Sequence, residues 1–189
     1  MIIIRNLITI FTLLFLIAAC NNITELKPEK VKIHYKTGEL WCEGTYRVYK
    51  EGLSEKKNRI GVWNFYHLDG KISDQIEYDK FGNMINRKEY STLGLLTVSQ
   101  IVEDNVTTKT EYLPNGTTKY ELIERVELET DDDAESEVYY YTYKEFFENG
   151  KIRELREYTG EDIQSLQIWD EKENIILEVE YEDGIIEAK

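Results

Sequence analysis

The sequence predicts an all-β protein built from repeated antiparallel β-hairpins. Runs rich in Tyr, Ile and Val alternate with polar residues, and the chain contains 14 tyrosines with 41% hydrophobic residues, which favours folded β-structure over disorder. Turn signals recur at strand-length intervals, for example 12 residues from Gly70 to Gly82 and 10 from Gly150 to Gly160. No long helical period interrupts them, so the chain is expected to be a β-repeat.

Residues 1–19 are expected to be a signal segment outside the fold. One positive charge at Arg5 precedes an uncharged apolar run over residues 7–19. Residues 17–20, IAAC, resemble the bacterial lipobox, in which the chain is cut before the cysteine and its thiol is lipidated. The resemblance implies a lipid on Cys20. The alternative is a retained transmembrane anchor, but the run of 13 residues is shorter than the ~20 needed to cross a bilayer.

The remainder divides into a polar tether over residues 20–30, which contains Pro28, and a repeat domain over residues 31–189. Its length suits one domain or one repeat array. The formal charge of −14 predicts that the chain does not bind nucleic acid and that its charge does not attract it to anionic lipid headgroups. We therefore expect the protein to be attached to the membrane through the lipid on Cys20. With Cys20 acylated, Cys42 is the one remaining thiol, predicted to be a small buried hydrophobe.

The stretch GVWNFYHLDGKI, residues 61–72, predicts a hairpin with a tight turn at Asp69-Gly70, where positive φ angles are needed at both central residues. This register places Trp63 opposite Ile76 and His67 opposite Ile72. One face is then the drier one, carrying Trp63, Phe65, Ile72, Ile76 and Tyr78 with Asp74 as an exception, and the other carries Asn64, Tyr66, Ser73, Gln75 and Glu77.

A second hairpin is expected around Asn149-Gly150. A two-residue turn places Glu145 against Glu154, which is unfavourable. A three-residue turn with a Gly bulge instead pairs Glu145 with Arg153 and Lys144 with Glu154, and is preferred. Residues 50–60, which are basic, and 127–137, which are acidic, interrupt the pattern and are interpreted as solvated loops.

The pattern G-x-W-x-x-Y-x-x-[DN]-G-K-[IL] resembles a bacterial variant of the MORN repeat. The residues that carry the resemblance are Gly61, Trp63, Tyr66, Asp69, Gly70, Lys71 and Ile72, with a partial copy at Phe147, Asn149, Gly150, Lys151 and Ile152. The resemblance implies an antiparallel meander of β-hairpins in a single-layer or half-open elongated sheet. Some bacterial members of this family are labelled antitoxin components of toxin–antitoxin systems, and others are exported lipoproteins of unknown role.

No catalytic constellation is found in the sequence. His34 and His67 do not have metal-ligand spacing, and no P-loop, GxGxxG or GxSxG motif is present. Carboxylates are so abundant that no pair of them is diagnostic of hydrolysis. The run Asp131-Asp132-Asp133 lacks the interleaving and the glycine of a calcium loop. We therefore expect no enzyme, no cofactor and no metal.

Tyrosines are the candidates for function. Tyr139, Tyr141 and Tyr143 lie in a strand with aromatics on both faces, where they either bind a protein or glycan or pack in ladders along the sheet. The expected function is a non-catalytic binding module of the bacterial cell envelope, anchored in the membrane as a lipoprotein, in the outer membrane if the host is Gram-negative. The alternative, implied by the resemblance, is an antitoxin-like or immunity protein that neutralises a toxin. A hydrolase is the third hypothesis.

Overall fold

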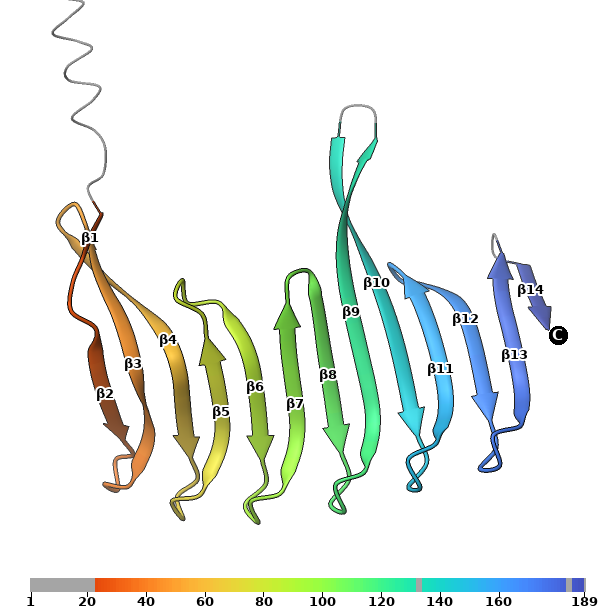
Figure 1. Ribbon diagram of the computed structural model, residues 1–189, viewed down its shortest axis with the longest axis horizontal. Helices are drawn as coiled ribbons and strands as arrows, with labels where there is room; N and C mark the ends of the chain where they lie inside the picture. Colours follow the sequence, from red (N-terminus) through yellow and green to blue (C-terminus); the bar gives the residue numbers. More distant parts are fainter. Residues whose placement is uncertain (1–22, 132–133, 183–184, 189) are drawn as a thin grey trace, which may run out of the picture.

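The computed structural model describes residues 23–131, 134–182 and 185–188, which form a single antiparallel β-sheet (Figure 1). Fourteen strands are found in these ranges: β1 Ile23–Glu25, β2 Glu29–His34, β3 Leu40–Glu51, β4 Ser54–Tyr66, β5 Ile72–Tyr78, β6 Met84–Tyr90, β7 Leu96–Glu103, β8 Val106–Tyr112, β9 Thr118–Asp131, β10 Ala134–Phe146, β11 Ile152–Thr159, β12 Asp162–Trp169, β13 Ile175–Glu182 and β14 Ile185–Ala188.

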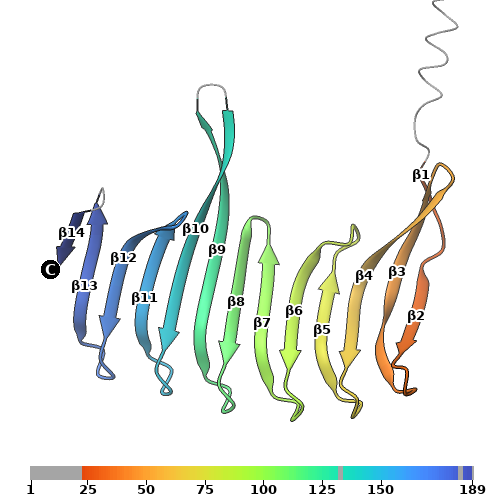
Figure 2. The ribbon, with the colours of Figure 1, turned by 180° about the vertical axis from the view of Figure 1, so that it is seen from behind.

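The strands are arranged as a meander. From β3 to β14 each strand pairs with the next one along the chain, while β1 and β2 both pair with β3. Seen from front and back, the sheet is one layer, and no other element in the described part of the chain covers either face (Figures 1 and 2). Within the described ranges no pairing joins β14 to β1 or β2, so the sheet is open. The all-β meander predicted from the sequence is confirmed.

Six turns at one end of the strands share one geometry, and we call this end the glycine end. In each five-residue turn the first N–H donates to the fifth carbonyl and the fourth N–H donates to the first carbonyl. The turns span residues 35–39, 67–71, 91–95, 113–117, 147–151 and 170–174, and residues 79–83 repeat the geometry at the opposite end. The fourth residue has positive φ and is Gly in every case except Glu173, with φ 68°.

The turn at Asp69-Gly70 therefore differs from the predicted two-residue turn. Gly70 has φ 83°, but Asp69 does not have positive φ. The hydrogen bonds are those of a type I turn closed by a Gly bulge, in which a single residue needs the left-handed conformation. The side chain of Asp69 favours this turn because its Oδ1 accepts the backbone N–H of Lys71 at 3.1 Å.

In the β4–β5 hairpin the predicted pairing of Trp63 with Ile76 is confirmed, and Phe65 pairs with Asp74. Ile72 pairs with Tyr66, and His67 is not its partner, because a bulge follows Phe65 and the turn closes with one more residue than predicted.

In the β10–β11 hairpin the preferred three-residue turn with Gly150 at the bulge is found. A second bulge after Glu145 nevertheless shifts the register, so that Glu145 pairs with Glu154 and Lys144 with Leu155; the predicted pairs are wrong. The Arg153 guanidinium still lies 3.4 Å from the Glu145 carboxylate. The like charges that argued against this register are therefore compensated by a neighbouring cation.

All five side chains that are buried in the described part of the chain lie on the same face of the sheet. They are Cys42, Val48, Trp63, Glu154 and Val179. Directly opposed residues share a face, so the register carries this assignment from strand to strand. We call it the tryptophan face and the other the polar face. Cys42, fully buried, confirms its predicted role as a small hydrophobe, and burial raises the pKa of its thiol.

Trp63 is the centre of the largest aromatic cluster. Its indole ring lies directly over Gly44 in β3, and its Nε1 donates to the Thr45 carbonyl at 3.1 Å. The Tyr46 ring packs edge-on at 4.8 Å, and the Arg59 guanidinium lies 4.8 Å from the indole ring. A β-bulge between Glu43 and Thr45 and the positive φ of Gly61 accommodate the ring. A single-layer sheet has no second layer to bury a side chain, so Trp63 is buried against its own strand neighbours.

The opposite end of the strands carries two extended hairpins, β3–β4 and β9–β10, and we call it the long-hairpin end (Figure 1). Residues 50–60 and 127–137, interpreted from the sequence as loops, are in their described parts almost entirely strand. In the first segment only Gly52 and Leu53 form a turn, and the other residues belong to β3 and β4. Cross-strand ion pairs such as Lys56 with Glu51 compensate the charges of these strand residues. High charge in these segments marks solvent-exposed strands.

The predicted tether over residues 20–30 overlaps two strands. Residues 23–25 pair with the last residues of β3, and strand β2 begins at residue 29, with Pro28 in the connection between the two. Arg47 fixes this segment through hydrogen bonds to the Glu25 carboxylate at 3.0 and 3.3 Å. Residues 1–22, which include the predicted signal segment and Cys20, lie outside the described residues.

Candidate binding surface

The repeat-motif residues have structural roles. In both Asp69-Gly70-Lys71 and Asn149-Gly150-Lys151 the Asp or Asn side chain accepts the lysine N–H, at 3.1 and 3.0 Å. Each lysine ammonium then donates to the second residue of the next turn at the glycine end, to the Thr92 carbonyl at 2.7 Å and the Glu171 carbonyl at 3.2 Å. The motif therefore closes one turn and ties it to the following one.

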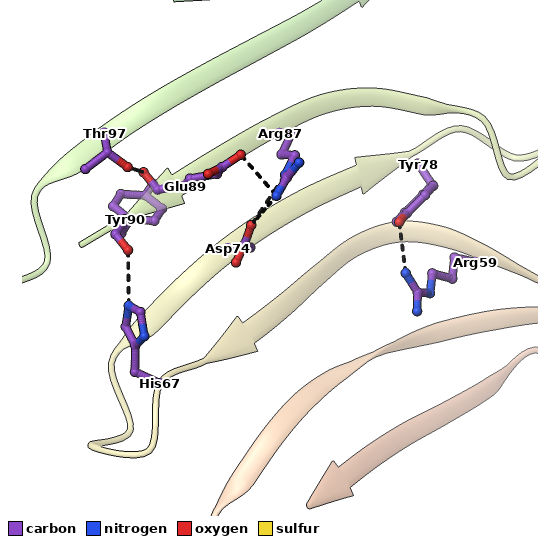
Figure 3. Close-up of polar contacts among 8 residues, drawn as sticks. All are labelled: Arg59, His67, Asp74, Tyr78, Arg87, Glu89, Tyr90 and Thr97. Carbon is purple, nitrogen blue, oxygen red and sulfur yellow. Dashed lines mark hydrogen bonds and ion pairs between the residues drawn. The ribbon is translucent and has the colours of Figure 1, made fainter. Parts of the chain in front are cut away.

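Tyr66 and His67, at the end of the same hairpin, also make interstrand contacts. The Tyr66 hydroxyl donates to the Glu43 carboxylate at 2.7 Å on the polar face. His67 Nε2 lies 3.1 Å from the Tyr90 carbonyl (Figure 3). Among the residues that the structure describes, no group of three His, Cys, Asp or Glu side chains is placed to hold a metal ion.

The tyrosines of β10 lie as the sequence predicts, on both faces of the strand. Tyr139, Tyr141 and Tyr143 are half-buried on the tryptophan face, and Tyr140 lies on the polar face. The rings of Tyr139 and Tyr141 stack at 6.4 Å with an interplanar angle of 14°, and Tyr143 packs against Tyr120 in β9 at 5.8 Å. Ladder packing along the sheet is therefore real, and it still leaves part of each ring accessible.

A hollow opens on the tryptophan face beside these rings. It has a volume of about 270 Å³ and is lined by Leu122, Tyr141, Tyr143, Arg156, Tyr158 and Gly160. The register brings these residues together: Leu122, Tyr143 and Arg156 are opposed across three strands, and Tyr141 faces Tyr158. Gly160 donates its N–H to the Tyr139 carbonyl at 2.7 Å and has no side chain to fill the space.

The hollow combines aromatic surface with polar groups. The Arg156 guanidinium lies 5.7 Å from the Tyr143 ring centre and pairs with Glu154. Hydrogen bonds to Tyr158 and then to Glu154 raise the pKa of Arg156. Burial raises the pKa of Tyr143, and the hydrogen bond to Glu137 raises that of Tyr139. The Tyr139 hydroxyl already donates to Glu137 at 2.8 Å and lies outside the lining of the hollow, whereas the Tyr143 phenol, a protonated donor at neutral pH, and the Arg156 cation belong to it, a set suited to a partner with apolar and hydrogen-bonding groups.

Three carboxylates elsewhere on the tryptophan face are paired with cations. Arg87 bridges Asp74 and Glu89 at 2.9 and 3.0 Å (Figure 3), and Lys119 lies 2.8 Å from Glu111. These carboxylates belong to one row of opposed residues that crosses the sheet from β4 to β11: Phe65, Asp74, Glu89, Val98, Glu111, Tyr120, Glu145 and Glu154.

Glu145 and Glu154 are opposed on neighbouring strands, as the two carboxylates of a hydrolase-like pair would be. Each has its own arginine, Arg153 for Glu145 and Arg156 for Glu154, and Glu154 is only 7% exposed. The arrangement is that of structural ion pairs which offset like charges across a strand pair.

Sequence reasoning identified Tyr141 and Tyr143 but missed Leu122, Arg156, Tyr158 and Gly160 as their neighbours. The alternation R-E-Y at residues 156–158 places Arg156 and Tyr158 on one face and was the available signal. Their position beside β10 depends on the bulge after Glu145, which the sequence did not reveal.

No protein-family model matches the chain, and a comparison with curated proteins finds no relative. The resemblance to the MORN repeat thus rests on the motif residues themselves. In the described residues, no helix has the length and apolar character needed to cross a membrane.

Proposed function

We propose that this protein is a lipid-anchored, non-catalytic binding module of the bacterial cell envelope, and that the hollow beside Tyr141, Tyr143 and Tyr158 is its contact surface. The observation that carries the proposal is the half-exposed aromatic hollow on an uncovered sheet face. Aromatic and arginine side chains in a partly desolvated depression are the groups that contribute most to protein interfaces. A protein with an extended segment is the partner that fits a shallow open hollow of this kind.

Site-directed photocrosslinking tests the contact surface. A photoreactive phenylalanine analogue at Tyr143 should crosslink one defined envelope protein, and the same analogue at Tyr140, on the polar face of the same strand, should not. Tyr141→Ala with Tyr143→Ala should weaken that capture by about tenfold or more, since interface tyrosines often contribute ~2 kcal/mol.

The matched control is Tyr140→Ala, whose ring lies against Arg125 at 4.8 Å on the other face. Far-UV circular dichroism establishes that each variant is folded before capture is compared. Equal crosslinking from both positions contradicts the assigned face. A turnover that a single Glu154→Gln change abolishes contradicts the non-catalytic role, and a crosslinked toxin would make the protein an immunity protein.

Acyl labelling tests the anchor. The motivation is the sequence of residues 17–20, IAAC, and wild type is expected to incorporate a radiolabelled or alkyne fatty acid and to fractionate with membranes. Cys20→Ala should abolish the label, whereas Cys42→Ala should keep it, because Cys42 is fully buried in the sheet. Unlabelled wild type that stays membrane-bound would show that the apolar segment itself is the anchor.

A further inference from the structure

The chain enters the sheet at the long-hairpin end. Ile23, the first described residue, is paired with Glu51, the last residue of β3. The next two residues, Gly52 and Leu53, form the turn into β4. Strand β1 lies at this corner of the sheet in both views (Figures 1 and 2).

Chain length limits how far this corner can lie from the proposed lipid. Three residue steps separate Cys20 from Ile23, and even a fully extended chain covers only about 11 Å in three steps. Strand β3 has 12 residues and spans about 40 Å at ~3.3 Å per residue. A bilayer-embedded lipid on Cys20 therefore holds the β3–β4 turn near the membrane, while the glycine end can extend far from it.

The turn has the surface that a membrane interface accepts. Leu53 is completely exposed, with a relative accessibility of 105%, and Ile23 is 61% exposed. Two lysines beside them are paired: Lys56 pairs with Glu51, and Lys57 lies 2.5 Å from Glu29. The exposed Lys50, which also lies beside the tip, is a cation that anionic headgroups attract, so an apolar tip with these flanking charges can enter the headgroup region.

Neither face of the sheet suits flat adsorption. The tryptophan face carries the Asp74, Arg87 and Glu89 network at its centre (Figure 3). The polar face carries ion pairs such as Lys144 with Glu121 at 2.8 Å. Laying either face on lipid would desolvate these charges across many strands, whereas contact through the turn desolvates few.

We propose that the β3–β4 turn faces the membrane, with Leu53 inserted at the boundary between headgroups and acyl chains, and that the opposite, glycine end of this hairpin points away. The inference rests on the proposed lipid on Cys20. It places the aromatic hollow on a sheet that stands away from the bilayer, accessible to a partner from the side.

Depth-dependent fluorescence quenching tests this orientation in the full-length, lipidated chain. An environment-sensitive dye is attached through Leu53→Cys or, as the matched control, Leu93→Cys in a turn at the glycine end, where Leu93 is 77% exposed. Fully buried Cys42 does not compete for the label. The vesicles contain phosphatidylethanolamine, phosphatidylglycerol and a nitroxide lipid with a shallow spin label. The dye at position 53 should be quenched about threefold more than the dye at 93, with a blue-shifted emission.

Flotation of the same samples separates the two proposals. Vesicle-bound protein whose dye at 93 is quenched as much as or more than the dye at 53 overturns the orientation and leaves the anchor intact. Protein that incorporates no fatty acid and does not float with the vesicles contradicts the proposed lipid anchor, and the proposed orientation with it. Flotation with selective quenching at 53 supports both.

Discussion

Among the glycines of the sheet, Gly44 is the one whose replacement by alanine is expected to lower the free energy of unfolding most. A Cβ at this position would lie 2.2 Å from Cδ2 and 2.4 Å from Cε2 of Trp63, far inside contact distance. The ring cannot retreat without losing its hydrogen bond to Thr45 and its contact with Tyr46. Trp63 is fully buried, so displacement exposes apolar surface.

The magnitude follows from that burial. A buried tryptophan removes about 200 Å² from water, which at ~25 cal/mol per Å² gives an upper bound of about 5 kcal/mol. Gly44→Ala displaces the ring but does not remove it, so the free energy of unfolding should fall by about 3 kcal/mol. Trp63→Ala should lower it by about 3–5 kcal/mol.

A double-mutant cycle in urea, followed by far-UV circular dichroism, tests the cause. In the Trp63→Ala background the methyl group at 44 meets no ring, and Gly44→Ala should then cost less than about 0.5 kcal/mol. Gly116→Ala serves as the control: its Cβ meets no atom within 4 Å, but φ is 84°, so its cost of about 1 kcal/mol comes from backbone strain and should not change with Trp63. An equal cost of Gly44→Ala in both backgrounds would refute the steric explanation.

Three further predictions concern the turns. Glu173→Gly should raise the free energy of unfolding by about 0.5–1 kcal/mol, and the urea midpoint with it, because glycine adopts the φ of 68° without strain and only an exposed ion pair with Lys151 is lost. An unchanged or lower midpoint would mean that the turn is not strained. Gly70→Val should lower the same free energy by about 1–3 kcal/mol, since φ there is 83°; a wild-type midpoint would contradict the bulged turn. The carboxylate of Asp170 accepts hydrogen bonds from the Asn174 side-chain amide, which has the larger effect, and from the Asn174 backbone N–H. These bonds hold the pKa of Asp170 below its ordinary value. The corresponding stabilisation is complete above the unfolded-state pKa of about 4 and is lost as pH falls through the lower folded-state value. Asp170→Asn should therefore lose less stability than wild type on acidification below that pH, and parallel pH profiles of the urea midpoint would refute the linkage.

Local sequence rules determined the fold class and the positions of most turns. A Gly preceded by Asp or Asn fixes a bulged turn through the φ of one residue and one side-chain hydrogen bond, both of which involve neighbours in the chain. Alternation along a strand fixes which residues share a face, and this placed Trp63 opposite Ile76 and put Tyr139, Tyr141 and Tyr143 together. The turn positions and the shared faces were predicted correctly because each needs only a few consecutive residues, whereas the predicted two-residue turn at Asp69-Gly70 was wrong.

The tertiary structure decided what depends on two strands at once. A bulge that shifts β11 by one residue places Arg156 and Tyr158 beside Tyr143 and Tyr141, and no consecutive stretch of sequence encodes that choice. In the same way Gly44 is recognisable as the seat of Trp63 only when β3 and β4 are paired. The charged segments of the long hairpins looked like loops because charge is typical of loops, yet both are paired strands, and in the first of them Lys56 and Lys57 form interstrand ion pairs. Register is set by the summed energies of contacts between distant residues, and so it is fixed only when the sheet is assembled.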